Sequence, residues 1–460
     1  MNIFFFLLLL LLFAFTVSVS FSSDPLHYQT FFIKPLPKLP KFETLSWDTK
    51  QLSESLSESN TTLIILPLHN IDHLSLASNY TRESLILKRL HRDVVRARAM
   101  ACGKPRQFSS PVTSGLPLDD GGYVTRLGVG TPATNFYMSI DTGSDLSWLQ
   151  CLPCDGCYHQ HDPFFDPSKS KSFASVNCKS TLCKLANLCV KGHNKCSYEQ
   201  EYGDGSTTEG DLSTETFTFG ETKVKQIAFG CSHNSKGMFG EVAGILGLGQ
   251  GVLSFTTQAD IHVFSYCLVD WESKSASSYL MFGNSTVFRK TVFTPLLTSS
   301  DPNLDTFYLV ELQGISVNGT RVAGINQTLF KSGVVVDSGT TVTLLPQPAY
   351  KALRKAFRAG TRHLTRAKQM SILDTCYNLT GMTKVNVPTV VLHFRGADVS
   401  LTASNCLIPM EETVRGTFCF AFAATPEGLG LSVLGNNQQK GFQVMFDLAN
   451  KKIGFTPSSC

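Results

Sequence analysis

The sequence predicts an all-β dominated fold made of two similar lobes, with a few short helices. One acidic phrase occurs twice, as Ile140-Asp141-Thr142-Gly143-Ser144 and as Val336-Asp337-Ser338-Gly339-Thr340, each at the end of an apolar run. An apolar-apolar-Gly element follows each phrase, with its glycine 106 residues after Asp141 and 98 residues after Asp337. This nearly equal spacing indicates an internal repeat in which each lobe supplies one aspartate.

Each phrase has the composition of a tight turn that presents a carboxylate. The first follows an aromatic and β-branched segment, residues 136–140, which we expect to be a strand. The glycine admits the backbone angles of the turn, and the neighbouring hydroxyls can hydrogen-bond the carboxylate. Two carboxyl groups that share one site cannot both ionise cheaply, so one proton is held between them. The pair would therefore combine a general acid with a general base.

From about Tyr123 to Cys460 the chain resembles the pepsin-like aspartic proteases. Between the first phrase and its apolar-apolar-Gly element lies a Gly-rich hairpin tip, residues 201–206, that matches the flap tyrosine motif of that family at Tyr202 and Gly203. Trp148 stands where the family has the tryptophan that supports this tyrosine. Alone, either acidic phrase would indicate an ordinary Asx turn, and both aromatic residues would indicate hairpin or core positions. Their common spacing favours the protease.

The resemblance implies a bilobal pepsin-like fold and an endopeptidase with Asp141 and Asp337 as its catalytic residues. One aspartate would take a proton from a water while the other donates a proton to the scissile carbonyl oxygen. Tyr202 would close over the peptide. The supporting residues would be the neighbours of the aspartates: Thr142 and Ser338 locking the loops together, Ser144 and Thr340 bonding the outer carboxylate oxygens, and Gly143 and Gly339 forming the turns. We expect neither a metal nor a cofactor, since no metalloprotease or serine-hydrolase phrase competes.

Fourteen cysteines indicate an oxidising compartment. Seven of them fall within residues 151–196, in an insertion between the first phrase and the flap. Their C-x2-C-x2-C spacing also occurs in zinc knuckles, but the apolar N-terminus and the even total favour disulfides. The insertion most resembles the nepenthesin-like plant branch of the family. That branch implies six disulfides here: Cys151 with Cys154, Cys157 with Cys231, Cys178 with Cys196, Cys183 with Cys189, Cys267 with Cys460, and Cys376 with Cys419. Cys102 and Cys406 are outside this set.

The chain divides by composition into four parts. Residues 1–23 read as a signal peptide because an unbroken apolar run precedes small residues; a retained anchor is the alternative, since no Lys or Arg precedes the run. Residues 24–107 read as a prosegment that ends in a basic helix at 83–100, for which a membrane-surface or nucleic-acid element is the alternative. Residues 108–300 and 301–460 would be the two lobes. The best helix within the lobes is Pro346–Ala359.

The net charge lies in the expected prosegment. Residues 1–107 hold 12 Lys and Arg against 8 Asp and Glu, whereas the remainder holds 28 of each. An enzyme with no net charge has no overall positive electrostatic field that would attract nucleic acid. The cationic prosegment would lie over the acidic cleft as an intramolecular inhibitor and leave on acidification. We expect a monomer without a membrane span in its mature form.

These observations predict a secreted aspartic endopeptidase, made as a zymogen and active on polypeptides in acid. The cell wall and apoplast are the first expected location and the vacuole is the second. Glycosylation sequons occur at Asn60, Asn79, Asn284, Asn318, Asn326 and Asn378. The alternative from another class is a catalytically inactive relative, either a glycanase inhibitor or a wall-associated binding protein. Intact aspartates, glycines and flap tyrosine favour the protease.

Overall fold

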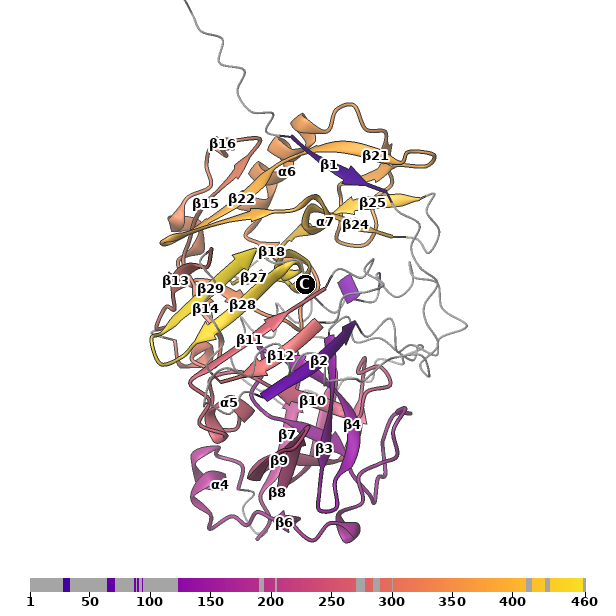
Figure 1. Cartoon of the computed structure of the whole chain (residues 1–460), viewed down its shortest axis with the longest axis vertical. Helices are drawn as coiled ribbons and strands as arrows, with labels where there is room; N and C mark the ends of the chain where they lie inside the picture. The colour runs from indigo at the N-terminus through magenta and orange to yellow at the C-terminus, as the bar shows by residue number, and fades with distance from the viewer. Residues whose placement is uncertain are drawn as a thin grey trace, which may run out of the picture.

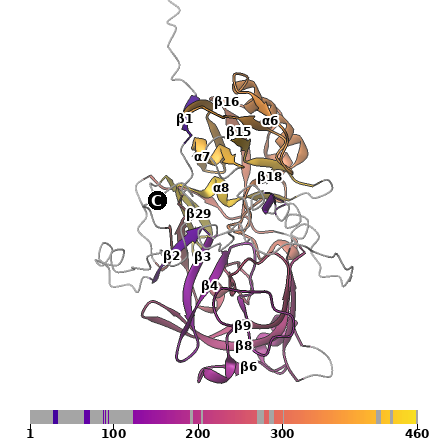
Figure 2. The ribbon, with the colours of Figure 1, turned by 90° about the vertical axis from the view of Figure 1, so that its right-hand side faces the viewer.

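Strands dominate the computed structural model and form two lobes, one above the other in Figure 1 and in the view turned by 90° in Figure 2. The predicted bilobal, all-β dominated fold is therefore confirmed. The structure describes residues 28–33, 64–70, 87, 89, 90, 93, 123–189, 194–202, 205–269, 278–283, 290–299, 301–410, 416–426 and 431–457.

A large sheet builds the lower lobe and continues into the middle of the molecule (Figure 1). Its strands are β2 (Ile64–Asn70), β3 (Tyr123–Val129), β4 (Thr134–Asp141), β5 (Trp148–Gln150), β6 (Ala174–Ser175), β7 (Ser197–Glu201), β8 (Thr207–Phe219), β9 (Thr222–Lys236), β10 (Gly244–Gly247), β11 (Val263–Cys267), β12 (Ser278–Phe282), β13 (Val292–Pro295), β28 (Phe442–Asp447) and β29 (Lys452–Pro457). Their order is β13-β29-β28-β11-β12-β2-β3-β4-β10-β5-β9-β8-β6, with β7 paired to β8. The last two strands of the chain therefore return to the sheet of the first lobe.

Smaller sheets build the upper lobe. A five-stranded sheet has the order β14 (Leu309–Val310), β17 (Val334–Val336), β27 (Ser432–Leu434), β18 (Thr343–Leu345) and β26 (Phe422–Ala424). Two four-stranded sheets follow, namely β16 (Thr320–Arg321), β15 (Leu312–Val317), β22 (Val390–Phe394) and β23 (Ala397–Leu401), and β19 (Arg366–Ala367), β20 (Cys376–Asn378), β25 (Thr417–Phe420) and β24 (Leu407–Pro409). The pair β1 (Tyr28–Phe32) and β21 (Lys384–Pro388) lies at the top (Figure 1).

The helices are short except for α6 (Gln347–Gly360), which confirms the predicted helix to within one residue at each end. It buries Tyr350, Leu353 and Phe357 at helical spacing, and Phe357 stacks on Phe420 of β25 at 4.1 Å. No helix in the described part of the chain has the length and apolar character needed to cross a membrane. The others are α4 (Thr181–Leu185), α5 (Phe255–Gln258), α7 (Ala403–Cys406), α8 (Asn436–Gln439), and the 3-10 turns η3 (Pro167–Lys169), η4 (Pro302–Leu304) and η5 (Gln327–Phe330).

The segment expected to be a prosegment contacts both lobes. Strand β2 pairs with β12 on one side and β3 on the other, and its Leu66 and Leu68 are buried. Strand β1 pairs with β21, and Phe31 packs edge-on against Phe418. The described residues of the expected basic helix, at 87, 89, 90 and 93, are helical. These residues therefore pack as part of the folded chain.

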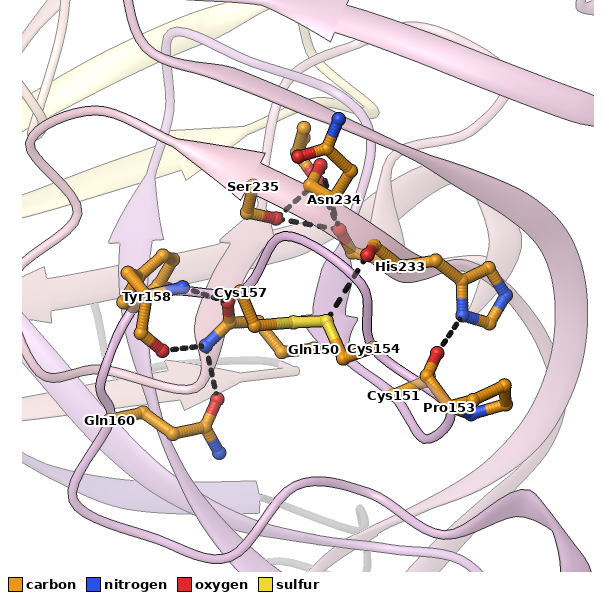
Figure 3. The surroundings of a disulfide bond; sticks show 12 residues. Gln150, Cys151, Pro153, Cys154, Cys157, Tyr158, Gln160, His233, Asn234 and Ser235 are labelled. Atoms are coloured by element: carbon orange, nitrogen blue, oxygen red, sulfur yellow. Dashed lines mark hydrogen bonds between the residues drawn. A yellow bond between two sulfur atoms is a disulfide. The ribbon is translucent and has the colours of Figure 1, made fainter.

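The pairing predicted for the first three cysteines of the insertion is wrong. Cys151 bonds to Cys231. Cys154 bonds to Cys157, and Figure 3 shows this second bond. The cause is the parallel pairing of β5 with β9, which places the Cys151 N–H 2.8 Å from the Ser232 carbonyl oxygen and its Cα 5.4 Å from that of Cys231. Cys154 and Cys157 then face each other across a loop with two intervening residues.

The pairing predicted for the next four cysteines is also wrong, because Cys183 bonds to Cys196 and Cys178 to Cys189. Cys183 lies on the buried face of α4 and shares a hydrophobic cluster with Cys196, so these two sulfurs meet in the interior.

The remaining cysteines agree with the prediction where the structure describes them. The bond between Cys376 and Cys419 is confirmed. Cys267 is disulfide-bonded, while its predicted partner Cys460 and the unassigned Cys102 lie outside the described residues. Cys406 is a buried free thiol, and burial raises its pKa. It is therefore a poor nucleophile.

This pairing can be tested by peptide mapping. Proteolysis of the unreduced protein should release one cross-linked peptide pair that joins Cys151 to Cys231. Recovery of a pair that joins Cys157 to Cys231 would contradict the structure. A reduced and alkylated sample is the control, because cross-linked peptides should vanish from it.

Candidate active site

The two acidic phrases meet through a reciprocal set of four hydrogen bonds. The Thr142 hydroxyl accepts from the Ser338 N–H at 2.9 Å and donates to the Val336 carbonyl at 3.0 Å. In return, the Ser338 hydroxyl accepts from the Thr142 N–H at 3.1 Å and donates to the Ile140 carbonyl at 3.2 Å. Thr142 and Ser338 are fully buried. We call this set the interlock; it joins residues 196 positions apart and puts each aspartate next to it.

Matched donors hold the two carboxylates. Oδ1 of Asp141 accepts from the Gly143 N–H, and Oδ1 of Asp337 accepts from the Gly339 N–H, both at 2.9 Å. The second oxygens accept from hydroxyls, that of Ser144 in the first phrase and that of Thr340 in the second. Asp141 is 2% exposed and Asp337 is 0% exposed. The two carboxylates therefore have equivalent orientation and nearly equal burial.

The apolar-apolar-Gly elements lie beside the acidic phrases. Strand β10 runs parallel to β4 with Gly247 opposite Asp141, and β27 runs parallel to β17 with Leu434 opposite Val336. An added Cβ would lie 2.2 Å from the Asp145 carbonyl oxygen at Gly247, and 2.6 Å from the Val342 carbonyl carbon at Gly435. Only glycine fits these close approaches, which explains why both copies of the repeat contain it.

The predicted flap tyrosine and its tryptophan are in contact. The Trp148 indole N–H donates to the Tyr202 hydroxyl at 2.6 Å. Phe239 packs edge-on against both rings, with centroids 4.8 Å from Trp148 and 5.6 Å from Tyr202. Tyr202 ends the β7 hairpin arm and is largely buried. Gly203 lies outside the described residues.

Asp145 is a half-buried acid near the first aspartate that sequence reasoning missed. Its Oδ1 accepts from the Gly251 N–H at 2.8 Å. Burial raises the pKa of Asp145, the hydrogen bond from the Gly251 N–H opposes this effect, and the charge of Asp141 raises the pKa further. The only sequence signal was its position four residues after Asp141, which is also typical of an exposed turn.

Helix α8 and a tyrosine of β11 support the second aspartate and were also missed. The Gln439 amide donates to the carbonyl oxygens of Asp337 at 3.1 Å and Leu434 at 2.8 Å, and its own oxygen accepts from the Tyr266 hydroxyl. The Asn436 amide donates to the Ser338 carbonyl at 3.0 Å. Burial raises the pKa of Tyr266, and the charge of Asp337 raises it further. The phenol therefore stays protonated as a donor.

An acid from the N-terminal segment also reaches the second phrase. The carboxylate of Asp93 accepts from the N–H groups of Thr341 and Val342, each at 2.9 Å. Asp93 is 0% exposed, and Leu90 is buried in one hydrophobic cluster with Val342 and Leu344. The expected prosegment therefore binds the chain directly beyond the second acidic phrase, and the residue that carries this contact is acidic.

Comparisons with known proteins match the chain along its length. Residues 123–284 match the family described as xylanase inhibitor N-terminal, and residues 307–457 match the one described as xylanase inhibitor C-terminal. Aspartyl protease family protein 2 of Arabidopsis thaliana is 48% identical over 96% of this chain and 96% of its own. Aspartic proteinase nepenthesin-2 of Nepenthes gracilis is 37% identical over 85% of this chain and 89% of its own.

Solved structures agree in fold. Basic 7S globulin from soybean superposes with a TM-score of 0.60 at 20% identity, covering 86% of this chain and 97% of the globulin. Conglutin gamma, a basic 7S globulin from lupine seeds, gives a TM-score of 0.60 at 18% identity over 86% of this chain and 95% of its own. At these identities the likeness extends to the fold alone.

Replacing Thr142 with valine should show what the interlock contributes. Valine keeps the shape but removes the hydroxyl, which leaves the Ser338 N–H and the Val336 carbonyl buried without this partner. We expect Thr142→Val to lower the free energy of unfolding by about 1–3 kcal/mol, measured by denaturant titration. Thr134→Val is the control, because Thr134 is exposed. Equal stability of both variants would contradict a structural role for the interlock.

Proposed function

The chain belongs to the nepenthesin-like family of plant aspartic proteases and is an aspartic endopeptidase, and on this premise we propose that Asp141 and Asp337 are its catalytic pair. The observation that carries the proposal is the interlock, which joins the turns that bear the two aspartates. The matched donors on the carboxylates add to it, because they fix both groups in the same orientation.

Hydrolysis would proceed by general acid and base catalysis without a covalent intermediate. The pair holds one proton. The ionised carboxylate takes a proton from a water, whose oxygen attacks the scissile carbonyl carbon, while the protonated carboxyl donates its proton to the carbonyl oxygen. The resulting gem-diol collapses when the amine nitrogen accepts a proton and the C–N bond breaks. Because the pair must hold one proton, we expect activity to be highest in acid.

Tyr202 would act as the residue that covers the bound peptide. Its hydrogen bond to Trp148 and its contact with Phe239 fix the arm of the β7 hairpin. The tip, which includes Gly203, would then close over an extended polypeptide. The substrate class is polypeptide, and we propose apolar side chains next to the scissile bond.

We further propose that residues 24–107 are a prosegment that keeps the precursor inactive. The support is the contact of Asp93 with Thr341 and Val342, just past the Asp337 phrase, together with the burial of Leu90 and Arg89. An ionised carboxylate accepts two N–H groups better than a protonated one, because protonation turns one oxygen into a donor. Acidification would therefore weaken this contact. The proposal adds an acidic anchor to the cationic attraction expected from the sequence.

The proposed location is the secretory route, ending at the cell wall or apoplast, with the vacuole as second candidate. Disulfides in both lobes suit an oxidising compartment. Among the proposed glycosylation sites, Asn326 and Asn378 are exposed, Asn318 is half-buried, and Asn284 lies outside the described residues. Asn326 and Asn378 are therefore the first sites to test.

The alternative function is a catalytically inactive glycanase inhibitor or wall-associated binding protein. The match of both halves of the chain to families described as xylanase inhibitor favours this alternative. The paired carboxylates with their full set of donors favour the protease. Cleavage of denatured haemoglobin in acid, blocked by pepstatin, would exclude the alternative.

The catalytic pair is tested by Asp141→Asn and Asp337→Asn. An amide keeps the shape of the side chain but cannot share the proton. We therefore expect each variant to lose nearly all of its proteolytic activity on denatured haemoglobin, with a rate at least about tenfold below that of the unaltered enzyme. Circular dichroism should show an unchanged fold. Retention of more than about a tenth of the activity by either variant would contradict the assignment.

The acidic anchor is tested by Asp93→Asn in the full precursor. Asparagine keeps one acceptor oxygen but replaces the other with an NH2 group. This donor would face a backbone N–H, which is also a donor, so one hydrogen bond is lost and the prosegment should dissociate more readily. We expect the precursor to be stable near neutral pH and to shorten itself in acid between residues 98 and 123, and the variant to shorten at higher pH. The measurement is gel analysis over a pH series.

Two further variants complete this test. Asp141→Asn reports cleavage by contaminating proteases, since it should not shorten itself. Joint replacement of Arg89, Arg92 and Arg96 by glutamine measures the cationic attraction separately. If neither Asp93→Asn nor the arginine variant processes at a pH different from that of the unaltered chain, latency has another cause.

A further inference from the structure

The second lobe carries a concentrated positive charge that the protease mechanism does not use. From Lys351 to Lys368 the sequence has seven Lys and Arg residues and no Asp or Glu, although charges balance over residues 108–460. This stretch comprises most of α6, the following turn and β19, in the upper lobe of Figure 1. A local excess of this size on a neutral background produces a positive field at one face.

A cavity of about 380 Å³ opens within this stretch. Its lining combines three guanidinium groups with two hydroxyl groups and one leucine: Arg358, Thr361, Arg362, Leu364, Arg366 and Tyr377. The hydroxyls of Thr361 and Tyr377 are buried and bond to each other at 2.6 Å. The guanidinium of Arg366 lies over the Tyr377 ring, 5.2 Å from its centroid. The lining is therefore partly ordered by its own contacts.

The carboxylate of Asp374 balances only part of this charge. This carboxylate pairs with the guanidinium of Arg354, and one of its oxygens lies 3.5 Å from a guanidinium nitrogen of Arg358. Arg366 instead donates to the backbone carbonyl oxygen of Asp374 at 3.0 Å. Burial lowers the pKa of Arg358, and the charge of Arg366 lowers it further, against the opposing effect of Asp374. Two neighbouring guanidinium groups, those of Arg366 and Arg354, therefore act on Arg358 against the single carboxylate of Asp374.

Arg362 is the residue that separates a binding role from a structural one. Arg358 and Arg366 both donate to the backbone carbonyl oxygen of Asp374, two residues before the disulfide-bonded Cys376. A structural role is therefore sufficient to explain these two arginines. Arg362 lines the same cavity and is exposed, yet it makes no hydrogen bond or ion pair with any residue that the structure describes. Within the described part of the chain, this third guanidinium therefore has no pairing partner.

We propose that this cavity is a binding site for an oxyanion group, a phosphate or a carboxylate. Guanidinium groups present paired N–H donors that match both oxyanions. Arg362 would contact the anion from the turn that follows α6, Arg358 from the end of α6, and Arg366 from β19. None of the lining residues belongs to the acidic phrases or the flap, so the site is additional to the proposed catalytic function.

The test uses the full chain near neutral pH and isothermal titration with inorganic phosphate, citrate or sodium chloride at matched ionic strength. We expect saturable one-site binding of phosphate or citrate and none of chloride. Saturation with phosphate alone identifies a phosphoryl site, whereas saturation with citrate alone identifies a carboxylate site. If neither phosphate nor citrate gives saturable binding, the proposal is wrong.

Variants then locate the binding. Arg362→Gln should weaken it by about tenfold or more, because one charge-assisted contact is lost, and Arg362→Lys should weaken it less. Lys355→Gln is the matched control, since Lys355 is exposed on α6, the helix that precedes Arg362, but does not line the cavity. If Lys355→Gln and Arg362→Gln weaken oxyanion binding equally, the effect comes from the overall positive charge, and the proposed site is wrong. Unchanged thermal unfolding of each variant excludes loss of fold as the cause.

Discussion

The interlock of Thr142 with Ser338 is the constraint on which the rest of the molecule depends. Each residue is both donor and acceptor to the opposite loop, so neither loop can move without leaving buried polar groups of the other without a partner. Because each aspartate precedes one of these residues, the position of the carboxylates follows from the backbone. The glycines at 247 and 435 serve the same end, since they let a neighbouring strand approach each loop closely.

Ties between the two repeats extend behind the interlock. Tyr308 accepts from the Val336 N–H through its carbonyl and donates through its hydroxyl to the Leu248 carbonyl at 2.7 Å, so it connects the second phrase to the chain following β10. Gln439 and Tyr266 connect the Asp337 backbone to β11 of the large sheet. A rigid polar framework of this kind lets an active site hold its geometry while the outer parts of the lobes differ.

Sequence reasoning succeeded where information is local or repeated, and failed where it depends on distant pairing. The duplicated phrases, their spacing and the helical periodicity of Tyr350, Leu353 and Phe357 are visible in the sequence. The bond of Cys151 to Cys231 depends on β5 lying beside β9, which no local pattern shows. Asp93 and Gln439 resemble ordinary polar residues of a helix, because their partners are 248 and 102 positions away. Contacts over such separations follow from topology, which one sequence does not encode in short motifs.

Strand β2 determines how the proposed prosegment could leave the enzyme after cleavage. It lies between β3 and β12, with ladder hydrogen bonds on both sides and Leu66 and Leu68 in the interior. Hydrolysis of one peptide bond further along the chain leaves all these interactions intact, since none of them passes through the cut. Extracting β2 would create two open strand edges at the centre of the sheet, which is unfavourable unless another strand takes the place. In the maturation proposed above, scission of the chain and departure of the cleaved segment would therefore be separate events, and a nicked chain that still retains β2 in its sheet would be a distinct molecular species.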